Sequence, residues 1–345
     1  MGYKLAGFDV IGANDIDPEM ARHYKTNHSP KHYYLEDIRV FRKRDDLPQE
    51  LYDLDILDGS PPCSSFSMAG NREKDWSKEK VFREGQAQQT LDDLFFEFIA
   101  LAKRLQPKVV IAENVKGMLA GNAKGYVVEV VKQFKEAGYD VQLFLLDGSL
   151  MGVPQKRERV FFVCRRKDLP FDKLTLNFNA RPIPLGEALK GTLHTFGRDC
   201  SKRAMAKYWK ICKPGKSLST VHPKGHLFNY YKLSPNKPAP TITARYECFY
   251  RWDALHSLTN EQFCLIGSYP LDYKFEKEAG YMIGMSVPPL MTYGVANEVF
   301  KQWFATMNRK DKPNGKENNV NKTKKKNESR VAKKPKATVQ KRRGS

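Results

Sequence analysis

The chain has 345 residues, of which 59 are Lys or Arg and 39 are Asp or Glu, so its formal net charge is +20. An excess of this size indicates a polyanionic partner, with nucleic acid as the first candidate. The 41% hydrophobic content excludes global disorder. No apolar run approaches the roughly 18 residues of a membrane span and no signal peptide is evident, so the sequence predicts a soluble intracellular protein without a membrane partner.

The six cysteines are scattered along the chain. They form no Cys-x-x-Cys pair and no Cys/His cluster with the spacing of a zinc site. We therefore expect neither a disulfide framework nor a bound metal.

Apolar runs of strand length alternate with helical periodicity through the first half, a pattern typical of a parallel sheet with crossover helices. Asp93–Leu105 places its apolar residues on one face, which predicts a helix that packs on the core. Two more helices are expected, at Pro18–Asn27 with a proline in the first turn, and at Tyr126–Ala137. The predicted strands are Phe8–Ala13, Leu54–Leu57, Lys108–Ala112, Asp140–Leu146 and Arg159–Cys164.

The pattern changes after about Phe171, where prolines and aromatic residues become frequent and helical periodicity is lost. This change indicates a second domain. A last helix at about Pro289–Phe304 carries apolar residues that we expect to pack back on the first domain. The sequence therefore predicts a main domain over 1–175, a smaller domain over 176–272, a returning segment over 273–307 and a tail over 308–345.

The tail holds over half of the excess charge, with 15 Lys and Arg against three Asp and Glu. It contains three valines as its only branched aliphatic residues and no aromatic residue, so we expect it to be disordered. Such a tail is either a solvated extension or a nonspecific arm that neutralises phosphates, and the composition leaves both open.

Cys63 follows a predicted strand and a Pro-Pro turn. In an open α/β sheet, ligands bind just past the carboxyl ends of the strands, and a rigid turn would hold a thiol at that place. Taken alone, the segment leaves two interpretations open, a nucleophile or a small packed residue.

Charged side chains mark two further strand ends. Glu113 ends a strongly apolar strand, where it is either a helix N-cap or a carboxylic acid that exchanges a proton. Gln155, Arg157 and Arg159 share one side of an extended segment, which is either a functional site or the solvated start of a strand. Each signal is weak alone, and their order along the chain is distinctive.

In this order the motifs resemble those of the DNA (cytosine-5) methyltransferases of the bacterial and phage type. The resemblance implies a Rossmann-like α/β methyltransferase sheet with a target recognition domain, here 176–272. It implies an enzyme that acts on double-stranded DNA, either beside a cognate restriction endonuclease or as an orphan methylase. We expect a monomer in the cytoplasm of a bacterium or a phage-infected cell. The matching motifs are Pro62-Cys63, Glu113-Asn114-Val115, Gln155-x-Arg157-x-Arg159, Leu233–Thr243, Leu258–Tyr273 and Gly284–Pro289.

The resemblance also implies a mechanism. Carbon 5 of cytosine is a poor nucleophile, so Cys63 would attack carbon 6 and generate an enamine that accepts a methyl group from S-adenosylmethionine. Glu113 would give a proton or a strong hydrogen bond to ring N3. Arg159, with Arg157 beside it, would hold the base oxygen and orient the thiol. The target base must leave the duplex, and Ser64–Gln89 would be the loop that closes over it.

The cofactor would lie at the first strand ends. Asp15 would hold the ribose hydroxyls, and Asp37 would accept the exocyclic amine of adenine. Met285 departs from the family pattern, which more often has Asn there. The other cofactor residues that the resemblance implies are Ile16, Ile38, Pro62, Leu94 and Ser286.

The resemblance fails at the first strand. The family's strand with its Phe-x-Gly-x-Gly-Gly turn has no counterpart before Phe8, and the strand is central in such a sheet. Its loss would leave two neighbouring strands with unpaired backbone groups, which should be destabilising. We therefore expect the functional protein to be longer, with a split enzyme or an inactive DNA-binding remnant as alternatives.

Base recognition is expected in the second domain, although the sequence does not reveal which DNA site is methylated. A tRNA cytosine-5 methyltransferase is an alternative with the same chemistry, and the length of the recognition segment favours duplex DNA. The candidate phosphate contacts are Lys213, Lys216, Lys224, Lys232, Lys237 and Arg245, and the candidate base or backbone contacts are His222, Asn229, Thr241 and Thr243.

Overall fold

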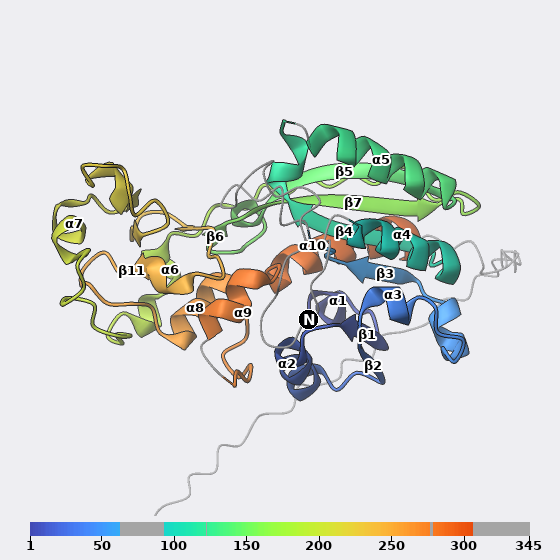
Figure 1. The fold of residues 1–345 in the computed structure, drawn as a ribbon, viewed down its shortest axis with the longest axis horizontal. Coiled ribbons are helices and arrows are strands. Elements are labelled where there is room, and N and C mark those ends of the chain that lie inside the picture. Colours follow the sequence, from blue (N-terminus) through green and yellow to red (C-terminus); the bar gives the residue numbers. More distant parts are fainter. Residues whose placement is uncertain (63–92, 122, 277–278, 306–345) are drawn as a thin grey trace, which may run out of the picture.

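The structure is a computed structural model that describes residues 1–62, 93–121, 123–276 and 279–305. Cys63, the Ser64–Gln89 loop and the basic tail lie outside the described residues. Within the described part, no helix is both long enough and apolar enough to cross a membrane. The larger of the two units, which carries the main sheet, and the smaller unit around α6–α9 lie side by side in Figure 1.

The helices of the larger unit are α1 (Gly2–Leu5), α2 (Pro18–His28), α3 (Ile38–Phe41), α4 (Leu94–Leu105), α5 (Ala123–Glu136) and α10 (Pro289–Val299). Its strands are β1 (Gly12–Asp15), β2 (His32–Leu35), β3 (Ile56–Gly59), β4 (Val109–Val115), β5 (Tyr139–Asp147), β6 (Gln155–Lys156) and β7 (Glu158–Arg166).

The main sheet has the strand order β3-β4-β7-β5. Strands β3 and β4 are parallel, as expected, whereas β7 is antiparallel to both of its neighbours. The expectation of a wholly parallel sheet was therefore wrong, because β5 and β7 follow each other without a crossover helix between them. The α/β class itself is confirmed.

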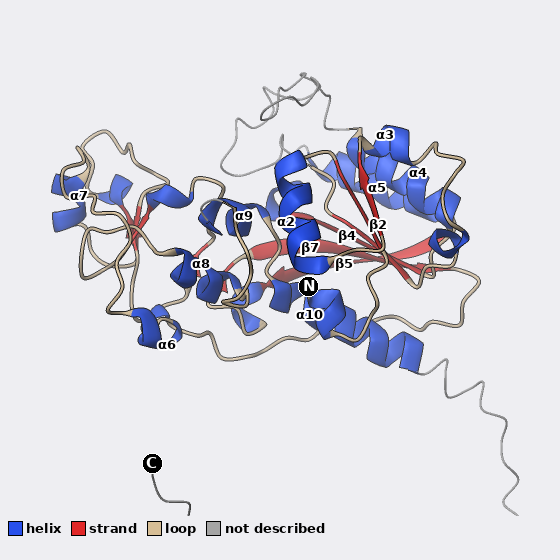
Figure 2. Ribbon diagram, turned by 90° about the horizontal axis from the view of Figure 1, so that it is seen from below, coloured by secondary structure: helices blue, strands red, loops and turns tan. Residues whose placement is uncertain are grey.

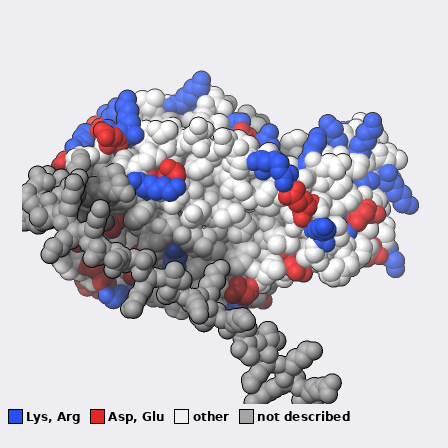
Figure 3. Space-filling model, turned by 180° about the vertical axis from the view of Figure 1, so that it is seen from behind, with Lys and Arg blue, Asp and Glu red and all other residues white. Residues whose placement is uncertain are grey.

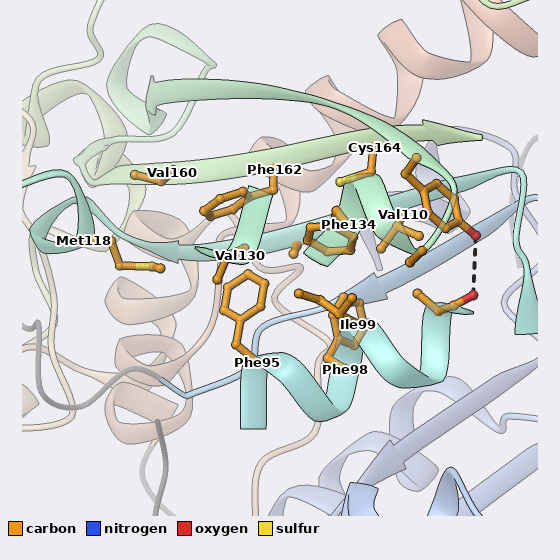
Figure 4. Packing of buried hydrophobic residues seen from close by; sticks show 14 of the residues in the cluster. Phe95, Phe98, Ile99, Val110, Met118, Val130, Phe134, Val160, Phe162 and Cys164 are labelled. Carbon is orange, nitrogen blue, oxygen red and sulfur yellow. Dashed lines mark hydrogen bonds between the residues drawn. The ribbon is translucent and has the colours of Figure 1, made fainter. Parts of the chain in front are cut away.

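Helices α4 and α5 cover one face of this sheet. The stripe predicted on Asp93–Leu105 is confirmed, because Leu94, Phe95, Leu101 and Leu105 are all buried. Around Phe95 the aromatic rings meet edge to face, for example with Phe162 at 5.3 Å between ring centroids. Figure 4 shows this cluster between helix and sheet.

Helix α10 covers the opposite face (Figure 2). Its Val295 and Val299, with Trp303 in the following π-helical turn, pack against Ile111 and Phe161 of the sheet. Phe8 lies in the same cluster, with its ring 5.9 Å from that of Phe300. This packing explains why Phe8, expected to open a strand, instead lies in the connection before β1.

Strands β1 and β2 form a separate parallel sheet of two strands. Among the described residues neither β1 nor β3 has a second hydrogen-bonded neighbour. Strand β2 has the sequence His-Tyr-Tyr-Leu, which is too short and too polar to be recognised from its pattern.

The smaller unit has little regular structure. Its strands β8, β9 and β11 form a three-stranded sheet, and β10 pairs with β6 of the larger unit. A second contact between the units is made by the Ser268 hydroxyl, which accepts from the Leu290 amide of α10 at 3.2 Å. Asn27 of α2 exchanges two hydrogen bonds with the backbone of Lys274 in the returning segment, at 2.9 and 2.8 Å. The elements are α6 (Leu185–Ala188), α7 (Ala206–Ile211), β8 (Lys216–Ser217), β9 (Tyr231–Lys232), β10 (Ala239–Pro240), β11 (Phe249–Tyr250), α8 (Asn260–Gly267) and α9 (Ala279–Met285).

Candidate active site

An ion pair lies where β4 ends and β7 begins. The antiparallel register places Val115 opposite Arg159, and Arg159 Nε donates to Glu113 Oε1 at 2.8 Å. Only 10% of the Glu113 side chain and 13% of the Arg159 side chain are exposed. The structure therefore brings together two predicted site residues that are 46 positions apart in the sequence.

Burial disfavours the charge on Arg159. Desolvation lowers the pKa of this guanidinium, and the neighbouring Glu113 carboxylate opposes that shift. Since a buried cation without its partner would be costly, the neighbouring Glu113 side chain stabilises the charged form of Arg159. A ligand that approaches this site meets a carboxyl oxygen and guanidinium nitrogens held in one place.

Asn114 links this ion pair to the turn before Cys63. Its Nδ2 donates to the carbonyl oxygen of Pro61 at 3.0 Å, and its Oδ1 accepts from the Val115 amide. The Pro61-Pro62 turn is thus fixed beside the end of β4, although Cys63 itself lies outside the described residues. We did not assign this role from the sequence, and the available signal was a buried amide directly after Glu113.

Arg157 lies elsewhere than expected. It is 2% exposed, and its two terminal nitrogens donate to the carbonyl oxygens of Ile242, at 2.7 Å, and Gly284, at 3.0 Å. Both terminal nitrogens donate to the backbone, so Arg157 holds two segments together, and its contact to a base stays a prediction. Burial lowers the pKa of Arg157 to about 9.

Gly284 is required at this junction. A Cβ on this residue would lie 2.2 Å from the carbonyl oxygen of Thr243, far inside van der Waals contact. Gln155 completes the arrangement, because its Oε1 accepts from the Ile242 amide at 3.0 Å. Two residues of the Gln-x-Arg-x-Arg motif thus position the 242–243 and 284 segments, and the third pairs with Glu113.

Replacement of Arg157 by Met is expected to destabilise the protein by about 3 kcal/mol, because two buried carbonyl groups lose their donors. Chemical denaturation measures this change. Arg181→Met is the matched control, since Arg181 makes an ion pair with Glu187 at the surface and its loss should leave stability essentially unchanged. Equal stability of the two variants would contradict the assigned role.

The carboxyl ends of β1 and β2 carry the predicted cofactor residues. Asn14 Nδ2 ties the two ends together by donating to the carbonyl oxygens of Tyr34 and Glu36, at 3.0 and 2.8 Å. The Asp15 carboxylate accepts from the Asp17 amide at 2.9 Å, and burial raises its pKa. Asp37 caps α3 and accepts from both the amide and the guanidinium of Arg39.

The remaining cofactor candidates are placed differently. Leu94 is buried at the start of α4, Ile16 and Ile38 are partly buried, and Pro62 is exposed. The Ser286 hydroxyl accepts from the Tyr269 hydroxyl at 2.7 Å and donates to the Met282 carbonyl, so it is already engaged within the protein.

Asp58 is a charged group at the same edge that the sequence analysis missed. It lies at the end of β3, and its carboxylate accepts from the Tyr3 hydroxyl at 2.5 Å. Its side chain is exposed to solvent, yet the surrounding protein desolvates it and, together with repulsion from Glu113, raises its pKa from 3.8 to about 6. The available signal in the sequence was an acidic residue near the end of an apolar strand, directly before the segment Gly-Ser-Pro-Pro.

The raised pKa of Asp58 makes a pH-dependent contribution to stability. The folded state binds the Asp58 proton more tightly than the unfolded state does. The contribution of Asp58 to the free energy of unfolding is therefore fully present below about pH 4 and is lost as the pH rises through about 6. Asp58→Asn is therefore expected to raise stability at pH 7 by about 1 kcal/mol, a value reduced by solvent screening, and to leave it unchanged near pH 4. Thermal melts across this range measure the effect, and a constant difference at all pH values would contradict it.

The basic charge of the folded part is concentrated in the smaller unit. Residues 176–272 hold 14 Lys and Arg against six Asp and Glu, whereas the other residues up to 307 hold 30 of each. Figure 3 shows Lys and Arg side chains over this unit on the rear face. The phosphate candidates Lys213, Lys216, Lys224, Lys237 and Arg245 are exposed. Lys232 is not, because its ammonium lies over the Trp209 ring at 3.9 Å and donates to the Trp209 carbonyl.

Solved structures with the same fold are methyltransferases. A DNA modification methyltransferase encoded within an Escherichia coli prophage superposes with a TM-score of 0.64 at 19% identity, over 87% of this chain and 94% of that one. The Schizosaccharomyces pombe Dnmt2 methyltransferase gives 0.57 at 15% identity, over 87% and 94%. The fold is therefore that of the α/β methyltransferases.

The family model for the C-5 cytosine-specific DNA methylases matches residues 1–301. The chain belongs to this family. Type II methyltransferase M.NgoPII of Neisseria gonorrhoeae is 38% identical over 173 residues, which are 49% of this chain and 45% of that protein. M1.HphI of Haemophilus parahaemolyticus is 26% identical over 87% of this chain and 83% of that protein.

The coverage of these relatives differs. The chain spans slightly less than half of M.NgoPII and 48% of M.FnuDI from Fusobacterium nucleatum, to which it is 38% identical over 187 residues. The orphan methyltransferase M.SPRI of Bacillus phage SPR is 31% identical over 51% of this chain and 37% of that protein.

Proposed function

We propose that this protein methylates carbon 5 of cytosine within a specific sequence of duplex DNA. The observation that carries the proposal is the buried Glu113–Arg159 pair beside the turn that leads to Cys63. A carboxyl group, a guanidinium and a thiol are the groups that addition to a cytosine ring requires, and Cys63 directly follows the turn.

Each residue has a defined task in this reaction. The Cys63 thiolate adds to carbon 6 while Glu113 gives a proton to N3, so the electron pair displaced from the ring double bond makes carbon 5 nucleophilic. Arg159 donates to the base oxygen and, through its ion pair, keeps the Glu113 carboxyl oriented. After carbon 5 is methylated, a base takes its proton, the electron pair reforms the ring double bond and expels the thiolate from carbon 6, and N3 returns its proton to Glu113.

S-adenosylmethionine, when bound, supplies the electrophilic methyl group. The ends of β1 and β2 fit this cofactor. Asp15, next to the Asn14 side chain that joins the two strand ends, is a partly desolvated carboxylate that could accept from the ribose hydroxyls. Ile16, Ile38 and Leu94 offer apolar surface for the adenine. The Asp37 carboxylate lies just past β2 and could accept from the adenine amine, in addition to the hydrogen bonds that it accepts from Arg39. Ser286 is a weaker candidate for cofactor binding because Tyr269 already donates to its hydroxyl.

The smaller unit, residues 176–272, is proposed to recognise the DNA target. The net charge of the folded chain up to residue 307 is carried by this unit, and phosphate contacts position a protein on a duplex. Residues 1–175 with 273–307 would carry the chemistry. We propose a monomer in the bacterial or phage-infected cytoplasm that serves a restriction endonuclease or acts as an orphan methylase.

The test is transfer of labelled methyl groups from S-adenosylmethionine to unmethylated duplex DNA, with tRNA as the competing substrate. A second arm uses duplex DNA with 5-fluorocytosine, in which carbon 5 has no proton to lose, so the covalent adduct should persist. Label at carbon 5 of DNA cytosine and a trapped adduct are the expected results. Preferential labelling of tRNA would overturn the proposed substrate.

A second candidate function is DNA binding without methyl transfer. The separation of the β1–β2 sheet from the main sheet favours it, because the cofactor residues on β1 and β2 are then less firmly held against the active site. It predicts salt-sensitive DNA binding that does not depend on cofactor, with no label and no adduct in the assays above.

A further inference from the structure

Helix α3 carries two of the residues that are proposed to contact the adenine. Asp37 caps the first turn of the helix, and Ile38 is its first residue. Figures 1 and 2 show α3 beside α4, and the first residue of α4, Leu94, is buried. The position of the proposed adenine contacts therefore depends on how α3 is held against α4.

The end of α3 is held by Arg104 of α4. The two terminal nitrogens of Arg104 donate to the carbonyl oxygens of Arg42 and Arg44, and one of them also donates to the Tyr52 hydroxyl at 2.9 Å. A guanidinium suits this task because its donors lie in a fixed planar fork, so one side chain binds several acceptors at a defined spacing. Carbonyl groups at and beyond the end of a helix have no partner within it, and Arg104 supplies one for each of these two.

A second contact joins the same two helices. Glu97 lies seven residues before Arg104, which places it about two turns away on the same side of α4, and it accepts from the Arg42 guanidinium. Beside these polar contacts, Phe41 of α3 and Leu101 of α4 pack in one apolar cluster. In the described part of the chain no backbone ladder joins the β1–β2 sheet to the main sheet, so side-chain contacts such as these make the attachment.

We propose that Arg104 is a positioning residue for S-adenosylmethionine, because it fixes the 37–44 segment on α4 and so sets where Asp37 and Ile38 meet the adenine. The inference rests on the proposed function, in which those two residues contact the cofactor. Arg104 acts through the backbone of the segment. The Glu113–Arg159 pair lies on β4 and β7, so loss of the Arg104 contacts should affect cofactor binding and leave the chemical step in place.

Arg104→Met tests this role, with Lys103→Met as the matched control. Both substitutions remove one positive charge from α4, and Lys103 is exposed. We expect Arg104→Met to weaken equilibrium binding of S-adenosylmethionine about tenfold and to raise its KM by a similar factor, while kcat at saturating cofactor stays within about threefold. Lys103→Met should change none of the three. Calorimetric titration measures the binding and requires no methyl transfer.

Hydrogen exchange tests whether the effect is local. The amides of Arg42, Lys43 and Arg44 bond to carbonyl groups of α3. Their exchange should become about tenfold faster in Arg104→Met, whereas the amides of β4 should exchange as in the original chain.

Equal cofactor affinity in the two variants would overturn the inference. Weaker binding without faster exchange at residues 42–44 would also overturn it, since that result indicates a direct contact between Arg104 and the cofactor. Equally faster exchange in β4 would indicate a general loss of stability and would contradict a positioning role. If the original chain itself binds no S-adenosylmethionine, the proposed cofactor site is wrong, and the inference is overturned with it.

Discussion

Cys63→Ser is expected to abolish methyl transfer, with a loss of about 10⁴-fold or more, and to eliminate the adduct with 5-fluorocytosine DNA. A serine hydroxyl is almost entirely protonated at neutral pH, whereas an ordinary thiol is a few per cent thiolate, which is the far better nucleophile. The Asn114–Pro61 hydrogen bond fixes the turn just before residue 63, so the substitution should leave the surrounding geometry intact. Rates of label transfer and gel mobility of the adduct measure the two effects.

The matched control is Cys248→Ser in the smaller unit. Cys248 has a side-chain hydrogen bond with Tyr230, and a serine hydroxyl can replace that bond. This variant should keep transfer within about threefold of the original chain. Retained transfer in Cys63→Ser would contradict the proposed nucleophile, while DNA binding by Cys63→Ser shows that the variant is folded.

Glu113→Gln is expected to lower the rate constant for transfer by about 10²- to 10⁴-fold, with little change in DNA affinity. An amide can still accept the hydrogen bond from Arg159, so the local structure should persist, but it cannot give a proton to N3. Single-turnover kinetics separate this effect from binding.

Glu158→Gln is the matched control for Glu113→Gln. Glu158 begins β7 and pairs with Lys116 at 2.8 Å, where 52% of the lysine side chain and 34% of the glutamate side chain are exposed. Loss of an exposed pair changes stability by less than about 1 kcal/mol and should leave transfer unchanged. Equal losses in the two variants would indicate a general electrostatic effect and would contradict the assignment of Glu113 as the proton donor.

Elements with a strong periodic signal were predictable from the sequence. The apolar stripe of α4 and the continuous apolar run of β4 are each stable only when they are buried, and they are buried against each other. The order and direction of the strands were not predictable in the same way, because the antiparallel placement of β7 depends on long-range pairing with β4 and β5.

The sequence predicted which residues gather at the candidate site, but it did not predict which contacts each of them makes. Period-two spacing placed Arg157 and Arg159 on one side of a single strand, but the structure has two strands there, β6 and β7, with residue 157 between them. Arg157 therefore binds the Ile242 and Gly284 carbonyls, while Arg159 binds Glu113. Asp58 was missed because its raised pKa arises from packing and not from any motif.

The two units are joined at more than one place, and this has a consequence for target selection. Strand β6 pairs with β10, and through a different pair of segments the Ser268 hydroxyl accepts from the Leu290 amide of α10 at 3.2 Å. A connection at a single point would act as a free hinge, whereas attachment at separate points restrains rotation of one unit against the other. The basic unit and the Glu113–Arg159 pair are then kept at a constant offset. In the proposed reaction, the base that reacts would therefore be set by its distance along the duplex from the contacted phosphates.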